Sequence, residues 1–222
     1  MEGKILKLEK MGEFFDHRLK GYEEHQLNCI ESAREFYSCT AEQLPMFSKS
    51  KILDLGCGTG LELNEYFKRN PNAAVTGIDL ANGMLQSLKA KFADKQLTLI
   101  NDSYFNVPFG EKEYDAAISV ESLHHFTLEQ KIPLYKKLHE ALKEKGYFIL
   151  TDYIIENVEV ERQNFCELAR LKKEMGINDH EFYHYDTPLT REHETEALLS
   201  GGFSKVECVN KWGNTTMLKA YQ

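Results

Sequence analysis

The chain contains 222 residues, of which 42% are hydrophobic and 28% are charged, as in proteins that fold around a buried core. Its net charge of −8 disfavours a general affinity for nucleic acids, whose phosphates require a basic surface. No apolar run approaches the roughly 18 residues that a membrane-spanning helix needs, and the first ten residues, MEGKILKLEK, hold no signal-peptide core. We therefore expect one domain over residues 1–222, with no nucleic acid and no membrane among its partners.

The five cysteines are scattered and odd in number, with no C-x-x-C pair: Cys29, Cys39, Cys57, Cys166 and Cys208. This distribution is neither a zinc pattern nor a disulfide framework, so it predicts a reducing, cytoplasmic setting. We expect the protein to act there as a monomer or a homodimer.

Residues 1–49 precede the first predicted strand and have a helical pattern. From Tyr22 to Tyr37 the apolar and aromatic residues recur at spacings of three and four, which predicts one face of a helix. Such a segment cannot join a parallel sheet, so we expect it to form a cap or lid. A cap that closes over a ligand excludes water, and Tyr22 and His25 are therefore candidates for contact with a substrate. The aromatic residues Phe14, Phe15 and Phe36 are expected to be core contacts.

Residues 51–60, KILDLGCGTG, predict a short buried strand, a tight glycine turn and the start of a helix. Gly56, Gly58 and Gly60 occupy alternate positions, where the backbone adopts conformations that are costly with a Cβ and comes close to a ligand. The helix from Leu61 to Arg69 then presents its unpaired N–H groups to the turn. The pattern indicates a binding site for an anionic or strongly polar group.

The spacing argues against the two common phosphate-binding turns. A dinucleotide turn has the pattern G-x-G-x-x-G, but here Leu61 stands in place of the last glycine, which disfavours an NAD-dependent dehydrogenase. A P-loop needs Gly-Lys-Ser/Thr at its end, which Thr59-Gly60-Leu61 does not supply. Asp54, expected at the mouth of the turn, would repel a pyrophosphate and accept a hydrogen bond from an ammonium group.

Residues 73–79 predict a second strand that ends on Asp79, 23 residues after Gly56. An acidic residue about 20 positions after the turn is well placed to accept hydrogen bonds from two ribose hydroxyls. With the acidic residue and G-x-G-x-G of 54–60, the segment resembles the cofactor-binding turn of the class I S-adenosylmethionine-dependent methyltransferases. In that family the residue matching Asp79 binds the ribose of the adenosine.

The resemblance covers about residues 45–222 and implies the remaining cofactor contacts. Leu80 and Met84 would flank the adenine, Asp102 would lie near its amino group, and Ser103 would offer its backbone N–H to the ring. A turn-forming role for Asp102 stays open. Cys57 is expected to pack inside the turn rather than to act as a reactive thiol. The full predicted cofactor set is Asp54, Gly56, Cys57, Gly58, Gly60, Asp79, Leu80, Met84, Asp102, Ser103 and Val120.

Residues 114–120 form an apolar run typical of a strand in a parallel sheet, and Glu121, His124 and His125 follow it. Ligands of open α/β sheets bind beyond the carboxyl ends of the strands, so this loop should face the transferring methyl group. His124 and His125 are therefore the predicted catalytic residues, of which at most one faces the site. Glu121 is a further candidate for substrate contact. For each histidine, a role in satisfying helix-terminal backbone groups stays open.

The next segment predicts a helix over 130–143, a turn at Lys145-Gly146 and a strand over 147–153 that ends on the substrate candidate Tyr153. An insertion at about 155–188, with a helix near 158–175, stands where members of the similar family build substrate walls. His180 and His184 would share one face of a helix, but no third ligand is evident, and no metal is expected.

The C-terminal segment predicts a helix after Thr190 as N-cap, and then two strands over 203–209 and 215–221. The alternation of strands and helices predicts an α/β fold: a Rossmann-like, seven-stranded, mostly parallel, doubly wound sheet with an antiparallel C-terminal hairpin. The N-terminal helical lid spans 1–49 and the cofactor-binding core spans 50–222.

The predicted function is S-adenosylmethionine-dependent methyl transfer to an oxygen or nitrogen atom of a small-molecule acceptor. The protein would then position the acceptor and exclude water. The alternative is a non-catalytic module that binds S-adenosylmethionine or S-adenosylhomocysteine as a sensor or as a subunit of a complex. The sequence does not identify the acceptor.

Overall fold

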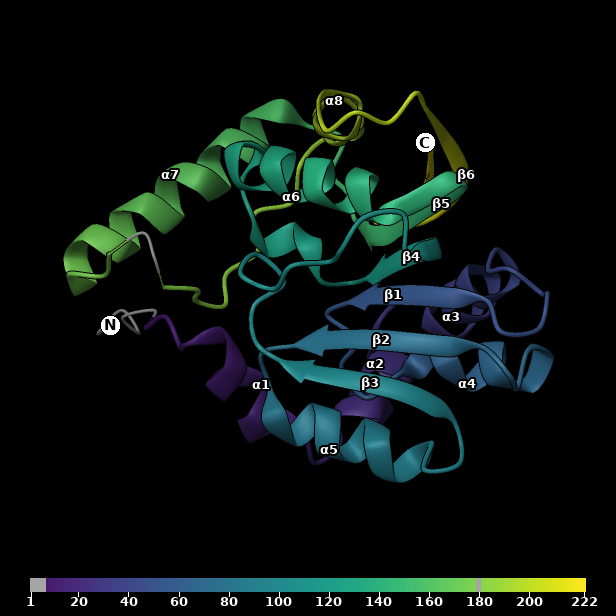
Figure 1. Cartoon of the computed structure of the whole chain (residues 1–222). Helices are drawn as coiled ribbons and strands as arrows, with labels where there is room; N and C mark the ends of the chain where they lie inside the picture. The colour runs from purple at the N-terminus through teal and green to yellow at the C-terminus, as the bar shows by residue number, and fades with distance from the viewer. Residues whose placement is uncertain (1–6, 179–180) are drawn as a thin grey trace.

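The computed structural model describes residues 7–178 and 181–222, and it confirms the predicted fold class (Figure 1). One seven-stranded sheet has the strand order β3-β2-β1-β4-β5-β7-β6. The strands are β1 (Lys51–Leu55), β2 (Ala74–Asp79), β3 (Gln96–Asn101), β4 (Tyr114–Val120), β5 (Leu142–Tyr153), β6 (Lys205–Trp212) and β7 (Thr215–Tyr221). Strands β1 to β5 pair in parallel, whereas β7 is antiparallel to both β5 and β6.

The strand order reverses between β1 and β4. From β1 the chain moves outward through β2 to β3, and then returns to place β4 on the other side of β1. The carboxyl ends of β1, β2 and β4 therefore meet at the switch point where open α/β sheets bind ligands. The segments that follow these three strands carry the glycine turn, Asp79 and the loop with the two histidines.

Helices cover both faces of the sheet and form two buried clusters. Helices α3 (Ala33–Glu42), α4 (Leu61–Arg69) and α5 (Asn82–Lys91) pack against one face, where Phe36, Leu63 and Leu88 are fully buried. Helices α6 (Leu128–Ala141) and α8 (Arg191–Ser200) pack against the other face, where Tyr135 and Leu198 are buried. Adjacent β1 residues divide between the two clusters, as the twofold side-chain period of a strand requires.

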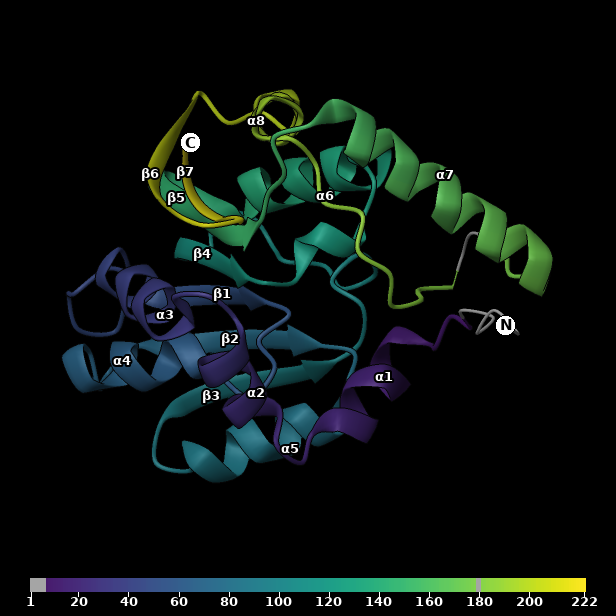
Figure 2. The same ribbon diagram turned by 180° about the vertical axis from the view of Figure 1, so that it is seen from behind.

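The N-terminal segment is helical, but the prediction of one continuous helix from residue 22 to 37 was wrong. The chain forms α1 (Met11–Arg18), α2 (Tyr22–Cys29) and α3, because Ile30 is extended and Ser32 has a φ of 57°. The break separates two roles: α3 packs into the core on one face of the sheet, whereas α1 lies beside the edge at which the parallel strands end (Figures 1 and 2).

Two further boundaries differ from the sequence-based prediction. Helix α6 begins at Leu128, because Thr127 accepts a hydrogen bond from the Gln130 N–H and the Gln130 side chain accepts one from the Thr127 N–H. The turn predicted at Lys145-Gly146 was wrong, because β5 begins at Leu142 and its register with β4 shifts between Leu142 and Tyr147.

The predicted helix near 158–175 is α7 (Val158–Met175), and Thr190 caps α8 as predicted.

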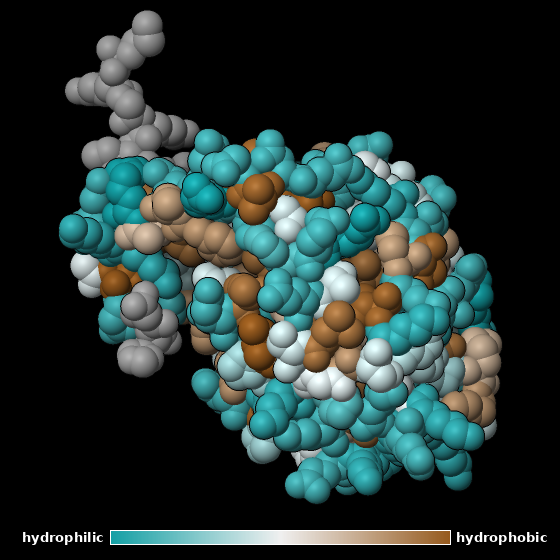
Figure 3. All heavy atoms as spheres, turned by 90° about the horizontal axis from the view of Figure 1, so that it is seen from above, coloured by the Kyte–Doolittle hydropathy of each residue, from teal (hydrophilic) through white to brown (hydrophobic). Residues whose placement is uncertain are grey.

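The face seen from above in Figure 3 is mostly hydrophilic, with hydrophobic residues in separate patches. Among the described residues, none of the helices combines the length and the apolar character needed to cross a bilayer. The five cysteines are free thiols.

Candidate active site

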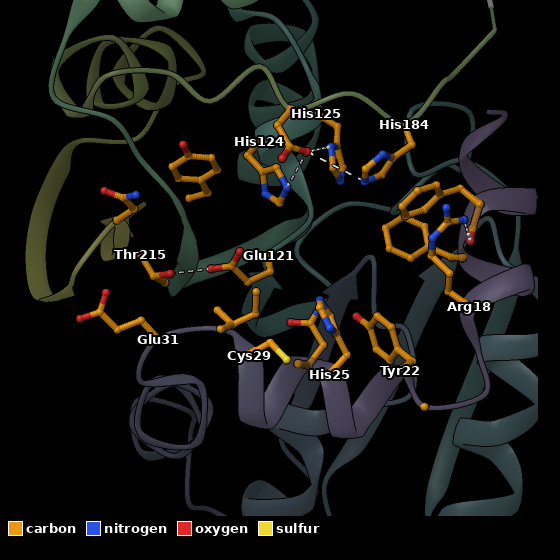
Figure 4. Close-up of a pocket in the computed structure, with 18 of the residues that line it drawn as sticks. Arg18, Tyr22, His25, Cys29, Glu31, Glu121, His124, His125, His184 and Thr215 are labelled. Atoms are coloured by element: carbon orange, nitrogen blue, oxygen red, sulfur yellow. Dashed lines mark hydrogen bonds and ion pairs between the residues drawn. The ribbon is translucent and has the colours of Figure 1, made fainter. Parts of the chain in front are cut away.

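Two adjoining cavities lie at the edge where the parallel strands end. The smaller, here called the crevice, has a volume of about 50 Å³ and is bounded by the glycine turn, the ends of β2 and β4, and helices α1 and α2. The larger, here called the chamber, has a volume of about 780 Å³ and is enclosed by α1, α2, the loop after β4, and residues 184–186 and 212–215 (Figure 4). Four residues line both cavities: Phe15, Tyr22, Glu121 and His125.

The glycine turn has the backbone conformation that its sequence predicts. Gly56, Gly58 and Gly60 have φ values of 73°, 46° and 71°, a region that side chains with a Cβ rarely adopt. A Cβ on Gly56 would come within 2.0 Å of the Ser122 hydroxyl, so the loop after β4 packs directly on the turn. At Gly58 the nearest atom to such a Cβ is the Tyr22 hydroxyl, at 3.8 Å, so a side chain there would project into the crevice.

Asp79 lies at the end of β2 and lines the crevice, as predicted. One carboxylate oxygen accepts a hydrogen bond from the Gly58 N–H and the other from the Ala81 N–H, both at 2.8 Å. Burial raises the pKa of Asp79, and these two N–H donors oppose that rise. The carboxylate therefore holds the glycine turn. Each of its oxygens still has a lone pair that can accept a hydrogen bond from a ligand hydroxyl in the crevice.

Asp54 does not lie at the mouth of the turn, where we expected it. Its side chain is 1% exposed, inside β1, and faces Glu62 in the first turn of α4, which is 4% exposed. Burial, and then the neighbouring Glu62, raises the pKa of Asp54 well above its ordinary value. Asp54 Oδ2 and Glu62 Oε1 have no hydrogen-bond donor among the described residues.

This carboxyl pair fits a cofactor that carries an ammonium group. A buried carboxyl oxygen without a donor is costly, and a cation that donates hydrogen bonds would satisfy it. Glu62 was missed by the sequence analysis, although its place directly after the glycine turn was a signal. Neither residue lines the crevice or the chamber, so contact of Asp54 with the cofactor stays a prediction.

The remaining predicted cofactor residues separate into two groups. Leu80, Met84 and Val120 line the crevice. Asp102 and Ser103 lie beyond it, at the end of β3: the Ser103 N–H is donated to Asp102 Oδ1 at 2.6 Å, and Asn106 Nδ2 donates to the same oxygen at 3.3 Å. Asp102 thus accepts hydrogen bonds from residues of its own loop, and its place near the adenine amino group stays a prediction. Cys57 is buried against Gly77, and burial raises the pKa of its thiol. Both observations agree with a residue that packs inside the turn rather than a reactive thiol.

Glu121 lines both the crevice and the chamber. It has a φ of 49°, which is uncommon for a residue with a Cβ and costs energy of about 1–3 kcal/mol. Its backbone N–H is donated to the Thr151 carbonyl at 2.9 Å, and its carboxylate accepts from the Thr215 hydroxyl at 2.9 Å. Burial raises the pKa of Glu121 to about 7. Strained residues of this kind gather at functional sites, because the surrounding fold must hold them.

His124 and His125 are both buried in a short 3₁₀ turn after β4, and both line the chamber, so the expectation that at most one faces the site was wrong. Their ring centroids are 4.0 Å apart. Burial alone would lower the pKa of His124, but Asp152, whose Oδ1 lies 2.6 Å from His124 Nδ1, raises it to about 9. Burial, and then the neighbouring His124, lowers the pKa of His125. His124 is therefore a cation and His125 a neutral imidazole near pH 7.

The opposite wall of the chamber comes from the N-terminal helices. Figure 4 shows Tyr22, His25 and Cys29 of α2 across from the two histidines, with Arg18 of α1 to one side. Tyr22 reaches both cavities, and burial raises the pKa of its hydroxyl above the ordinary value. Tyr153, the fourth predicted substrate residue, lines the chamber with its ring centroid 5.9 Å from that of His124.

The sequence analysis missed the side chains that surround the two histidines. Asp152 stands beside the predicted Tyr153, and its position at the end of a strand was the available signal. His184 and Asp186 lie outside the helices and strands and line the chamber. His180 lies outside the described residues, so its pairing with His184 stays a prediction. Tyr104 and Ser122 of the crevice were also missed.

The comparisons with known proteins agree with this geometry. A sequence family described as a methyltransferase domain matches residues 52–146, from β1 to β5. A carboxy-S-adenosyl-L-methionine synthase of Nautilia profundicola is 25% identical over the full length of both chains.

Two solved structures share the fold. A structure described as a putative O-methyltransferase of Nostoc punctiforme has a TM-score of 0.70 and 20% identity over 98% of this chain, which spans 63% of that longer chain. Human N-acetylserotonin methyltransferase, solved in complex with its cofactor SAM, has a TM-score of 0.60 and 19% identity over 84% of this chain and 51% of its own.

Proposed function

Because this chain belongs to the class I S-adenosylmethionine-dependent methyltransferases, we propose that it methylates an oxygen or nitrogen atom of a small molecule held in the chamber. The family makes the protein an enzyme with S-adenosylmethionine as its cofactor. The nature and place of the acceptor are the proposal.

The crevice supplies the residues that would hold the cofactor. Asp79 would accept hydrogen bonds from the ribose hydroxyls, and Leu80 and Met84 would flank the adenine. The buried carboxyl pair of Asp54 and Glu62 matches the ammonium group in charge and lacks a donor of its own. When bound, S-adenosylmethionine supplies a methyl group on a sulfonium, which is already electrophilic and needs no further activation.

One observation carries the proposal: the crevice and a much larger chamber share four lining residues, which form a common wall. Phe15, Tyr22, Glu121 and His125 line both cavities, so a group at the end of the crevice meets a molecule in the chamber there. The chamber, at about 780 Å³, falls within the roughly 300–1,000 Å³ typical of small-molecule sites. Its enclosure by α1 and α2 supports the predicted lid, because reaction at this wall requires water to be excluded.

The side chains on the shared wall suit an acceptor that loses a proton. Glu121 and His125 stand there, and either can take a proton by geometry. His124, held by Asp152, is better suited to balance negative charge on the acceptor. We propose Glu121, His124 and His125 as the catalytic group, with Tyr22, His25 and Tyr153 as substrate contacts.

A second candidate function is the synthesis of carboxy-S-adenosyl-L-methionine. It is favoured by the relative of that name from Nautilia profundicola, which aligns over the whole of this chain, including residues outside the matched methyltransferase domain. In this case the cofactor itself would be the molecule that is modified, and the chamber would hold the carboxyl donor.

Two measurements test these candidates. Calorimetry with S-adenosylmethionine, S-adenosylhomocysteine and NAD in parallel should show binding of the first two only. The protein is then incubated with S-adenosylmethionine and a panel of phenols, amines and carboxylic acids, and the products are separated by mass. Release of S-adenosylhomocysteine with a methylated acceptor supports the first candidate, and a carboxylated cofactor supports the second. Failure of the protein to bind either S-adenosyl compound would contradict both. The cytoplasmic location and the oligomeric state remain predictions.

A further inference from the structure

The wall of the chamber holds one carboxylate, Asp186, with three imidazoles around it. Asp186 Oδ1 lies 3.6 Å from His124 Nε2, 3.2 Å from His125 Nδ1 and 3.9 Å from His184 Nε2. The dashed lines in Figure 4 join the three labelled histidines through this carboxylate. One donor atom each from His124, His125 and Asp186 lies within 4.8 Å of the others.

These separations match the ligands of one metal ion. Two ligand atoms bound to the same tetrahedral zinc at about 2.1 Å lie about 3.3 Å apart. His184, whose Nε2 lies 3.9 Å from Asp186 Oδ1, is not within 4.8 Å of the whole set and stands beside it. From these observations we propose that His124, His125 and Asp186 form a binding site for a divalent ion of the zinc type, with the ion facing the chamber.

The groups behind the ligands fit the proposal. Asp152 Oδ1 lies 2.6 Å from His124 Nδ1, so it fixes that nitrogen as an N–H donor. His124 Nε2 would give up its proton when it binds the ion, because metal binding to an imidazole releases a proton. Asp152 is itself held by the N–H groups of Leu123 and Tyr153. A ligand that is oriented in this way binds a metal at lower entropic cost.

The charges agree with a divalent cation. The carboxylates of Asp152 and Asp186 stand beside the imidazoles of His124 and His125. The other charged or titratable groups toward the cluster are Glu121, Tyr153, His184 and Arg18. Two imidazoles with one carboxylate favour zinc, iron, cobalt or nickel over magnesium or calcium.

The proposal departs from the sequence-based expectation of no metal, and a metal titration decides between the two. The site also narrows the proposed acceptor, in a step that rests on the proposed function. An ion with three protein ligands keeps a position for water or substrate. The acceptor would then carry an oxygen or nitrogen donor able to bind that ion within the chamber.

The test uses the untagged full-length protein, freed of metal by a chelator and titrated with zinc chloride and with cobalt chloride. We expect one equivalent of zinc to bind, and cobalt to give the visible absorption of a four- or five-coordinate ion. The variants Asp186→Asn and His125→Gln should weaken binding at least about tenfold. His17→Gln is the matched control, because His17 lines the same chamber outside the cluster and should keep wild-type affinity.

Two results would overturn the site: less than about 0.1 equivalent of zinc at micromolar free metal, or wild-type affinity in both variants. Circular dichroism of each variant checks folding, and Asp186→Asn is the more conservative, since the side chain is 48% exposed and nearly the same shape. The titration needs neither cofactor nor acceptor, so its result stands apart from that of the methyl-transfer assay.

Discussion

The crevice and the chamber lie side by side but are built in different ways. The crevice depends on backbone: three glycines with positive φ, and Asp79 at the end of β2, whose carboxylate accepts from the Gly58 N–H of the turn and from the Ala81 N–H after the strand. The chamber depends on side chains from five separate segments, which meet only when the chain is folded. The crevice is small, at about 50 Å³, because Met11, Phe15 and Tyr22 of the N-terminal helices fill it from above.

The difference shows that binding the cofactor and binding the acceptor require different kinds of site. A cofactor that is the same in every member of the family can be recognised by a short, contiguous motif. An acceptor that differs between members is recognised by groups that can change one at a time without disturbing the sheet. The following predictions test whether the two cavities are separable in this way, and each addresses one of them.

The largest effect is expected at Gly58, in the crevice. Gly58→Val should abolish binding of S-adenosylhomocysteine in calorimetry, with a loss of at least about 1,000-fold in affinity, because the side chain strains the turn and enters the ligand's space. Gly176→Val is the matched control: its φ is 64°, it lies in open space after α7, and it should lose stability while keeping affinity. Equal affinities in the two variants would show that the glycine turn is only structural.

The second prediction concerns the chamber. His124→Ala and His125→Ala should each lower turnover by at least tenfold, within the roughly 10²- to 10⁴-fold range of proton-handling groups. Affinity for S-adenosylhomocysteine should barely change, since neither side chain is assigned to the cofactor. The measurement is the initial rate with an acceptor found in the screen. Full turnover in both variants would remove the histidines from the reaction, and a parallel loss of thermal stability and activity would indicate a scaffold role.

The third prediction returns to the crevice. Asp79→Ala should weaken S-adenosylhomocysteine binding by roughly 1.5–3 kcal/mol per charged hydrogen bond lost, or about 10- to 150-fold. Because Asp79 also accepts from Gly58 and Ala81, Asp79→Asn is the useful companion: it keeps an acceptor for the turn and loses the charge. Calorimetry on both variants, after folding is checked, separates the ribose contact from support of the turn. Wild-type affinity in the folded alanine variant would contradict the assignment.

The fourth prediction uses pH to examine the buried carboxyl pair. Burial raises the pKa of Asp54, so the folded state holds its proton more tightly than the unfolded state. Its contribution to the free energy of unfolding is therefore fully present below the unfolded pKa and is lost as pH rises through the raised, folded value. Asp54→Asn lacks this loss, so it should become more stable than the wild-type protein as pH rises. Urea unfolding between pH 4 and 9 measures the difference, and parallel curves would contradict the prediction.

These tests also separate what the sequence could and could not predict. Short contiguous patterns predicted the glycine turn, Asp79 and the strand Tyr114–Val120. They could do so because turn conformation and strand burial depend on residues that are adjacent in the sequence. The pairing of Asp54 with Glu62 was missed, since it depends on how the helix after the turn folds back over β1.

The chamber was less predictable for the same physical reason. His124 and His125 were identified from the strand that precedes them, but Asp186 reaches them from 61 residues further along the chain. No periodicity connects such residues, and residues 184–186 lie outside the helices and strands. The break after α2 was also hidden, because the apolar spacing continues through it although Ser32 has a positive φ.

The smallest effect is expected at the boundary between the cavities, where the N-terminal helices cover the crevice. Lys91 of α5 donates to Glu23 of α2, and also to the Thr59 carbonyl in the glycine turn at 2.9 Å. This pair ties the helices to the turn, yet a partly exposed ion pair contributes only about 0.2–1 kcal/mol. A crevice of about 50 Å³ is too small for a nucleoside, so we expect α1 and α2 to move when the cofactor enters.

Glu23→Gln should therefore raise the rate of S-adenosylhomocysteine dissociation by a few fold, measured by stopped-flow displacement. Glu24→Gln, one residue along on α2 and exposed, is the control and should leave that rate unchanged. In the wild-type protein, amide hydrogen exchange over residues 7–44 should slow when S-adenosylhomocysteine is added, because the helices close on it. Equal exchange with and without the ligand would make the segment a fixed cap, and the cofactor would then have to enter through the chamber.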